Sequence, residues 1–300
     1  MSVPTIVIIG GSFAGSGVAT NLEKQLSGKA QVILIEKKPH FHNCTASPRA
    51  IVDLAFADKT FITLSKLFKK SDFGSIVHDT VTKVGDKEVT LASGTTIAFD
   101  YLVIAAGSSY RSPFKSDKST KEDILAEYSK TFEAIQSAQR ILIVGGGPVG
   151  IESSAEIKVK FPEKDVTLVH SGDSLGYASL SSGFNGRLKT KLEALGVKIV
   201  LGEKVQNLEN ASTAKSFTTD KGTVLDADHV IVATGTGKPH SSFMEPSFVN
   251  DKGEIKVLPT FQLDEQHSNV FALGDVAASG DPKLALKAGD RKFVIARLNA

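Results

Sequence analysis

The amino-acid sequence predicts an α/β fold in which one unit, a strand followed by a glycine loop and a helix, occurs twice. The segment beginning at Ile6, Ile-Val-Ile-Ile-Gly-Gly, resembles the segment beginning at Ile141, Ile-Leu-Ile-Val-Gly-Gly. Residues 100–107, which end in Ala-Ala-Gly, resemble residues 228–235, which end in Ala-Thr-Gly. Within each copy, the two segments are separated by far more than the roughly 20–50 residues of a solenoid repeat. The pattern therefore indicates duplication of a whole domain.

The secondary structure expected for the two copies has the same order. Continuous apolar runs are typical of strands buried on both faces, as in a parallel sheet. The expected strand, helix and strand are residues 5–9, 14–26 and 32–35 in the first copy and 141–144, 149–159 and 166–169 in the second. This spacing predicts a βαβ unit with a right-handed crossover in each copy.

Short strand-like segments predict a small antiparallel β element in each copy, and a polar connection predicts a domain boundary. The strand-like segments are residues 88–91, 95–99, 216–219 and 223–225. The polar, helix-rich connection covers residues 121–139. We expect a first domain from residues 1–118, an inserted domain from residues 119–240, and a return to the first domain over residues 241–300.

Composition narrows the class of protein. With 35 Lys and Arg against 33 Asp and Glu, the net charge of +2 gives no long-range attraction to nucleic acid or anionic lipid. Cys44 is the single cysteine, which excludes an internal disulfide, a Cys-x-x-Cys pair and a structural zinc cluster. No apolar run reaches the roughly 18 residues of a membrane span, and the first residues do not read as a secretory signal. We expect a soluble intracellular protein without a metal site.

The second glycine loop matches the dinucleotide fingerprint. It runs Gly145-Gly-Gly147-Pro148-Val149-Gly150 between a predicted strand and a predicted helix, the context that the fingerprint requires. Gly145 permits the tight turn, Gly147 lets the backbone approach a pyrophosphate, and Gly150 lets the helix pack on the strand. The helix N-terminus then offers unpaired N–H groups to the phosphates. The alternative, a glycine-rich turn without a ligand, is weakened by the duplicate copy.

The first glycine loop departs from the fingerprint at one position. It runs Gly10-Gly11-Ser12-Phe13-Ala14-Gly15, with Ser12 in place of the second glycine. The serine side chain crowds a phosphate without excluding it, and its hydroxyl can donate to one. Glu36 lies 21 residues after Gly15 at the end of the second strand, where an acidic residue accepts hydrogen bonds from ribose hydroxyls. The alternative for Glu36 is a surface carboxylate at a strand end.

The second copy lacks this acidic residue. His170 occupies the corresponding position, 20 residues after Gly150, and it is either a ribose contact or an ordinary strand-end residue. Because neither an acid nor an arginine selects the ribose, the nicotinamide cofactor is expected to be NAD(P)H. Gly235, at the end of the second Ala-Thr-Gly, is a further candidate contact.

Two dinucleotide-binding loops imply two bound dinucleotides. A third motif indicates which of the loops binds FAD. Residues 269–275 form an apolar strand ending in Gly274 and Asp275, where an aspartate can bind the ribityl hydroxyls of FAD. This motif follows both glycine loops, so the first domain is discontinuous. The sequence therefore predicts two Rossmann-like dinucleotide-binding domains, with the NAD(P)H domain inserted in a discontinuous FAD domain.

Four stretches carry a resemblance to a known family, and the resemblance covers nearly the whole chain. They are Phe-His-Asn-Cys-Thr-Ala-Ser-Pro-Arg-Ala at 41–50, Val-Gly-Ile-Glu-Ser-Ser-Ala-Glu-Ile at 149–157, Phe-Pro-Glu-Lys-Asp-Val-Thr-Leu-Val-His-Ser at 161–171, and Ala-Leu-Gly-Asp-Val-Ala at 272–277. The chain resembles the FAD/NAD(P)-dependent pyridine nucleotide-disulfide oxidoreductase-like family. Within it, the chain is most similar to the apoptosis-inducing-factor-homologous, ferroptosis-suppressor branch.

The resemblance implies roles for individual residues. The FAD contacts that it implies are the first glycine loop, Glu36 with the neighbouring Lys37, Arg49, the backbone near Thr82, Gly107, Asp275, and a helix starting near Lys283 whose N-terminus faces the flavin. It also implies that Glu152 is the catalytic residue beside the flavin and the nicotinamide, where a carboxylate can orient the ring. The alternative for Glu152 is a first-turn glutamate favoured by the helix dipole. Glu156, one turn later, is expected to be structural.

These features predict an FAD-dependent NAD(P)H oxidoreductase. Cys44 lies in the region that carries a redox disulfide in relatives, but the second cysteine is missing, so electrons are expected to leave the flavin directly. The acceptor that the resemblance implies is a quinone or another small oxidant. We expect Cys44 to be a packed thiol.

Other outcomes stay open. Relatives continue into a C-terminal interface segment, which a sequence ending at Ala300 is expected to lack. A truncated regulatory FAD-binding flavoprotein with little turnover is therefore one alternative, and an apoptosis-inducing-factor-like effector is another. The expected location is the cytoplasm, with mitochondrial, peripheral membrane or lipid-droplet association as alternatives, and no nucleic-acid partner is expected.

Overall fold

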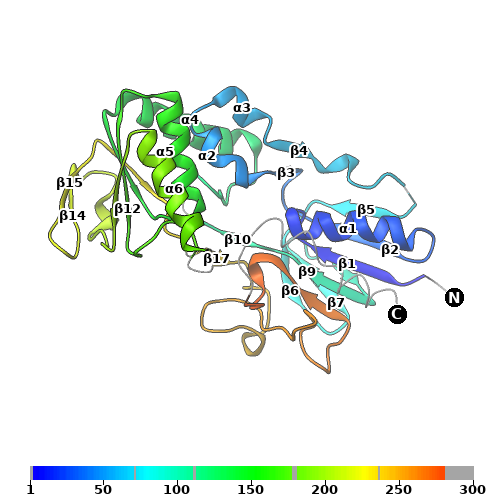
Figure 1. Ribbon diagram of the computed structural model, residues 1–300. Helices are drawn as coiled ribbons and strands as arrows, with labels where there is room; N and C mark the ends of the chain where they lie inside the picture. Colours follow the sequence, from blue (N-terminus) through cyan, green and yellow to red (C-terminus); the bar gives the residue numbers. More distant parts are fainter. Residues whose placement is uncertain (1–2, 71, 111–112, 178–180, 236, 281–300) are drawn as a thin grey trace.

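Two parallel sheets with helices packed on them form the two halves of the molecule (Figure 1). The computed structural model describes residues 3–70, 72–110, 113–177, 181–235 and 237–280. Within these residues, one sheet has the strand order β18-β9-β1-β2-β5 and the other has the order β13-β12-β11-β16. The predicted α/β fold of two Rossmann-like domains is confirmed.

The strand pairing repeats in the two sheets. The first sheet contains β1 (Thr5–Ile9), β2 (Gln31–Ile35), β5 (Gly74–Val77), β9 (Tyr101–Ile104) and β18 (Val270–Ala272). The second contains β11 (Arg140–Val144), β12 (Asp165–His170), β13 (Val197–Leu201) and β16 (His229–Val232). β1 lies between β2 and β9, and β11 lies between β12 and β16, all in parallel. β18 pairs with β9, so the chain returns to the first sheet after it completes the second. The discontinuity of the first domain is thus observed.

Two helices take corresponding places behind the glycine loops. α1 (Phe13–Leu26) follows β1, and α5 (Pro148–Lys160) follows β11, close to the predicted bounds. The predicted polar connection forms α4 (Lys121–Ser137), whose first turn is capped by the Thr120 hydroxyl, which accepts a hydrogen bond from the amide of Asp123. The sequence patterns did not indicate α2 (Ser47–Ala50), α3 (Leu54–Asp58) and α6 (Ser182–Ala194).

The small β elements lie outside the two parallel sheets. The predicted antiparallel segments form β7 (Glu88–Leu91) and β8 (Thr96–Ala98) in the first half, and β14 (Ser216–Thr218) and β15 (Val224–Asp226) in the second. β6 (Val81–Val84), which the sequence patterns did not indicate, pairs with β7. β3 (His40–His42) pairs with β4 (Phe61–Thr63). β10 (Ser108–Ser109) pairs with β17 (Lys238–Pro239), so the two strands at which the chain passes between the halves lie side by side.

Strand β1 is buried on both faces, as its continuous apolar run predicts. Ile6 and Ile8 pack with Leu22 of α1 in one hydrophobic cluster, whereas Val7 and Ile9 pack in a different cluster. Successive side chains of a strand point to opposite faces, so an unbroken apolar run fits only a strand covered on both sides. The covered faces leave the carboxyl ends of the strands for ligand contacts.

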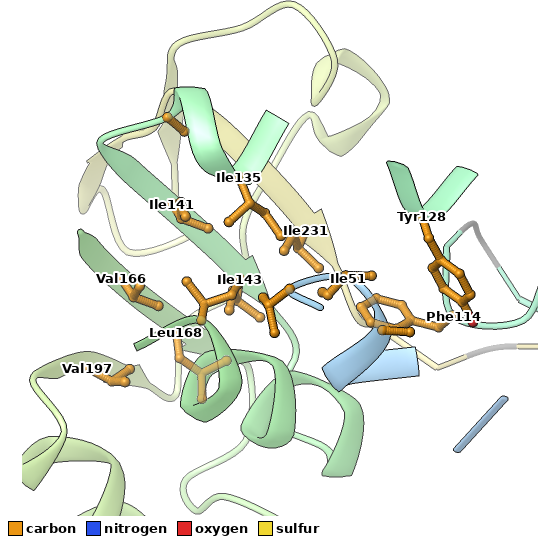
Figure 2. Close-up of a cluster of buried hydrophobic side chains, with 14 of the residues drawn as sticks. Ile51, Phe114, Tyr128, Ile135, Ile141, Ile143, Val166, Leu168, Val197 and Ile231 are labelled. Atoms are coloured by element: carbon orange, nitrogen blue, oxygen red, sulfur yellow. The ribbon is translucent and has the colours of Figure 1, made fainter. Parts of the chain in front are cut away.

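A further core cluster joins segments that are distant in the sequence (Figure 2). Ile51 lies just after α2 and Tyr128 lies on α4, and both are fully buried with Ile143 of β11 and Leu168 of β12. α2 and α3 therefore pack with the second sheet and its helices, although their sequence precedes the inserted domain. Part of the chain before residue 118 thus shares the core of the second domain. The boundary at residue 118 stays a prediction.

Replacing Ile51 with alanine should destabilise the protein by about 2–5 kcal/mol, because the side chain is fully buried and its removal leaves a cavity. The midpoint of urea unfolding, followed by circular dichroism, measures the change. Ile62→Ala is the matched control: this isoleucine is 58% exposed, and its loss should cost less than about 0.5 kcal/mol. Equal effects of the two substitutions would contradict the shared core.

Candidate functional site

The first glycine loop has the geometry that its sequence predicts. Gly10 has a φ of +98°, and a Cβ there would lie 2.4 Å from the carbonyl oxygen of Ala105. A Cβ on Gly15 would lie 1.8 Å from the carbonyl oxygen of Gly10, so only glycine lets α1 start this close to β1. Ser12 is the N-cap of α1, and its hydroxyl makes no capping hydrogen bond. That hydroxyl can donate to a phosphate at the helix N-terminus.

The second glycine loop repeats this geometry. Gly145 has a φ of +117°, and a Cβ there would lie 2.6 Å from the carbonyl oxygen of Ala233. A Cβ on Gly150 would lie 1.9 Å from the carbonyl oxygen of Gly145. Gly147, the N-cap of α5, has no atom within 4 Å of its Cβ position, and Pro148 starts the helix behind it. The open space beside Gly147 fits a pyrophosphate that approaches the backbone at a helix N-terminus.

Glu36 and His170 occupy equivalent places beside the two loops. The Glu36 carboxylate accepts hydrogen bonds from the amides of Gly11, at 2.6 Å, and Lys38, at 2.9 Å. The His170 ring lies against Gly146, whose Cβ position is 2.6 Å from the histidine Cγ. Burial lowers the pKa of His170, which favours the neutral imidazole. Their ribose contacts stay predictions, but both side chains lie at the strand ends where a ribose binds.

Asp275 lies at the end of β18, next to the start of α1. The preceding Gly274 has a φ of +73°, and its Cβ position is 3.2 Å from the Cβ of Ala14. The Asp275 carboxylate accepts a hydrogen bond from the Ser108 hydroxyl at 2.8 Å and from the Lys115 ammonium at 2.7 Å. The fold thus brings together the first glycine loop, Asp275 and the residues that follow Gly107, which are more than 150 residues apart from Asp275 in the sequence.

Sequence reasoning missed Lys115 and Ser108. Ser108 directly follows the Ala-Ala-Gly motif that ends at Gly107, so its position at the carboxyl edge of the sheet could have been inferred. Lys115 had no such signal, because it is one of 35 basic residues in a segment without periodicity.

Glu152 lies in the first half of α5 and is exposed, although neighbouring atoms shield part of its carboxyl from water. Burial raises the pKa of its carboxyl, and the negative charge of Glu156, one turn later, raises it further. Glu156 forms an ion pair with Arg49, whose Nη2 lies 2.9 Å from the Glu156 carboxylate. Arg49, predicted to contact FAD, therefore contacts the second domain here and links α2 to α5. This ion pair agrees with the structural role expected for Glu156.

The remaining predicted contacts lie in different surroundings. The Thr82 hydroxyl donates to the carbonyl oxygen of Thr90 within the small β element. The Lys37 ammonium is 3.5 Å from the carbonyl oxygen of Asp117. Gly235 follows β16 and has open space at its Cβ position. Lys283 lies outside the described residues. These roles stay predictions.

Burial also raises the pKa of the Cys44 thiol, which keeps it protonated at neutral pH. This agrees with a packed thiol rather than a reactive thiolate. In the described part of the chain, no group of His, Cys, Asp and Glu side chains has an arrangement that could hold a metal ion. None of the helices described there is long and apolar enough to cross a membrane.

Comparison with known proteins identifies the family. The family described as "Pyridine nucleotide-disulphide oxidoreductase" matches residues 4–291. The chain belongs to this family. Family members use FAD and NAD(P)H, and the two glycine loops, one of them open at Gly147, fit two dinucleotides. FAD is the cofactor and NAD(P)H is the co-substrate; the assignment of FAD to the first loop and of NAD(P)H to the second stays a prediction.

Individual relatives agree with the predicted branch. The chain is 34% identical to human ferroptosis suppressor protein 1 over 293 residues, covering 95% of this chain and 77% of the relative. It is 31% identical to apoptosis-inducing factor homolog B of Dictyostelium discoideum over 315 residues, covering 97% and 79%. The sulfide:quinone oxidoreductase of Aquifex aeolicus has a TM-score of 0.79 at 18% identity, covering 99% of this chain and 76% of that one. Reduced CoADR-RHD of Bacillus anthracis has a TM-score of 0.76 at 20% identity, covering all of this chain but 57% of that one. These two structures support the fold.

Two glycine substitutions should separate folding from ligand binding. Gly145→Ala places a Cβ against the Ala233 carbonyl at a positive φ, so it should lower stability by roughly 2 kcal/mol or more. Gly147→Ala fills open space where the pyrophosphate approaches, so it should fold normally but raise the Kd for NADH about tenfold. Thermal unfolding and titration with NADH measure the two effects. A Gly147→Ala protein that binds NADH normally would contradict the assignment of the loop.

The raised pKa of Glu152 also predicts a pH effect. A carboxyl whose folded-state pKa exceeds its unfolded value of 4.5 contributes stability in acid, and this contribution is lost as the pH rises through the folded-state pKa. Glu152→Gln removes it. The unfolding temperature of Glu152→Gln relative to the parent should therefore be higher at pH 7.5 than at pH 4.5. Glu163→Gln, an exposed substitution, should show no such change.

Proposed function

We propose that the protein is an FAD-dependent NAD(P)H oxidoreductase that passes electrons to a quinone-type acceptor without a redox disulfide. The observation that carries this proposal is the pair of equivalent glycine loops together with Asp275 beside the start of α1. One loop serves each dinucleotide, and Asp275 assigns the flavin to the first. The family membership supports the enzyme class.

The residues of the chain bind and orient the two cofactors. The N-termini of α1 and α5 face the two pyrophosphates, with the Ser12 hydroxyl as an extra donor at the first. Asp275 accepts hydrogen bonds from ribityl hydroxyls, and Glu36 accepts them from the adenosine ribose. When bound, FAD takes up a hydride from NAD(P)H and passes its electrons on; this chemistry belongs to the cofactor.

Glu152 serves to orient the nicotinamide. Its carboxyl lies at the surface of α5, on the second domain, and its raised pKa favours the protonated form more than in a free glutamate side chain. A carboxyl of this kind can hydrogen-bond the nicotinamide amide and hold the ring in position. Residues that hold a reacting group in place contribute to the rate by orientation.

The acceptor is inferred from two lines of support. The chain has a single cysteine, whose thiol is buried, so a dithiol relay within the chain is excluded. A sulfide:quinone oxidoreductase is among the structures with the same fold, and by its name it acts on a quinone. A quinone accepts electrons from the flavin directly. A cytoplasmic location, with peripheral association at a membrane, is part of the same proposal.

An anaerobic reductive titration tests the proposed function. The purified protein, supplied with FAD, should show the absorbance of oxidised flavin, which should bleach on addition of NADH or NADPH and return on addition of a short-chain quinone. Glu152→Gln should retain FAD but be reduced about 10–100-fold more slowly, because nicotinamide orientation is weakened. Glu163→Gln should be reduced at the parent rate. Flavin that bleaches but is not reoxidised by quinone would overturn the proposal of a quinone acceptor and favour a regulatory flavoprotein. Failure of the protein to bind FAD would overturn the proposal that it is a flavoenzyme.

A further inference from the structure

The Lys115 side chain is held beside Asp275 by direct contacts. Its ammonium lies 2.7 Å from the Asp275 carboxylate and 3.1 Å from the Ser108 hydroxyl, and Ser108 donates to the same carboxylate oxygen at 2.8 Å. The ring of Tyr110 lies 5.2 Å from the ammonium, within the range of a cation–π contact. The side chains of Asp275 and Ser108 and the ring of Tyr110 fix the position of the cation.

The contacts of Lys115 place it closer to the expected position of the flavin ring than to that of the pyrophosphate. The pyrophosphate belongs at the N-terminus of α1, which Gly274 approaches at Ala14, whereas Asp275 contacts Ser108 of β10. Lys115 contacts Ser108 of β10, which pairs with β17 where the chain passes between the two halves. A flavin ring must lie between the two halves to reach a nicotinamide held by the second glycine loop.

Four lysines and the three carboxylates of Glu36, Asp117 and Asp275 interact around this point, so positive charge is in slight excess. Besides Lys115, the cations Lys37, Lys38 and Lys238 all lie close enough to His240 to lower its pKa, after the larger effect of burial. The neighbouring thiol of Cys44 is kept neutral by its burial. Asp275 is the carboxylate in direct contact with the Lys115 ammonium. An additional negative charge at this edge of the sheet would therefore be stabilised.

Reduction of the flavin supplies such a charge. Transfer of a hydride, two electrons and one proton, from NAD(P)H to the neutral ring leaves NAD(P)⁺ and FADH⁻, so the ring gains one negative charge while the pyrophosphate charge is unchanged. A cation near the ring binds the reduced form more tightly, whereas a cation at the phosphates binds both forms equally. Charge near the flavin ring is one of the ways in which a protein tunes the cofactor.

We propose that Lys115 is a positioning residue that holds Asp275 and Ser108 and supplies a fixed positive charge to the flavin ring, stabilising its reduced form. This inference rests on the proposed function, since it requires FAD at the first glycine loop. Lys115 belongs to neither glycine loop and makes its contacts with Asp275 across 160 residues of sequence.

The test compares FAD affinity in the two redox states. Lys115→Gln keeps a donor for Asp275 and Ser108 but removes the charge. Apoprotein is titrated with FAD, and the bound flavin's midpoint potential is measured with dithionite and a reference dye. The affinity for reduced FAD should fall about tenfold more than the affinity for oxidised FAD, because only the reduced ring carries the additional negative charge that the lysine attracts. A tenfold difference lowers the potential of this two-electron couple by about 30 mV.

Two control variants are matched to Lys115→Gln. One retains the positive charge at position 115, and the other removes a lysine charge elsewhere in the same segment. Lys115→Arg retains the charge and should keep the affinity ratio of the parent. Lys118→Gln removes an exposed lysine of the same segment and should also leave the ratio unchanged. Should Lys115→Gln not fold, Lys115→Met gives the same comparison without a hydrogen-bond donor.

The outcomes separate this inference from the proposed function. An equal loss of affinity in both redox states, or no binding of either state by a folded variant, would make Lys115 a general binding residue and overturn the inference. The measurement needs neither NAD(P)H nor an acceptor. A parent protein that binds FAD but is not reduced by NAD(P)H would therefore contradict the proposed function, while the ratio measured with Lys115→Gln still decides the role of the lysine.

Discussion

The close approach of a helix to the turn that precedes it is the contact on which both halves of the molecule depend. Gly15 against the Gly10 carbonyl and Gly150 against the Gly145 carbonyl leave no room for a side chain. This contact starts each helix directly behind its strand, so the unpaired N–H groups of the first turn face the carboxyl edge of the sheet. The position of every other residue at the two cofactor sites is set relative to these helix N-termini.

A second constraint joins the two halves. Tyr128 of α4 is fully buried, and its hydroxyl is 2.6 Å from the Ser47 hydroxyl and 2.9 Å from the His42 ring. Burial, together with the nearby Lys38, lowers the pKa of His42 to about 4, so this histidine is neutral at physiological pH. Because the histidine is neutral, no charge is buried here. Because the polar atoms are hydrogen-bonded to one another, their burial leaves none of them unpaired. The segment around α2 is thereby held against the second domain.

The electrostatics of the candidate site differ between the two halves. The FAD side carries the fixed pair of Lys115 and Asp275, whereas the nicotinamide side carries Glu152, whose carboxyl is favoured in its protonated form, and a neutral His170. A neutral His170 brings no charge to this strand end, which is compatible with either nicotinamide cofactor. The Arg49–Glu156 ion pair joins α2 to α5 and is exposed enough to contribute little to stability.

The sequence by itself determined the duplicated βαβ unit, both glycine loops, the equivalence of Glu36 and His170, and the place of Asp275 after a strand. These features depend on backbone geometry within a few residues, which apolar runs and glycine spacing record directly. The tertiary structure decided the partners of Arg49 and Lys115 and the packing of α2 on the second sheet. The two ion pairs join residues that are more than 100 positions apart. They follow from how finished elements pack, and a charged side chain in an aperiodic segment carries no local signal of its partner.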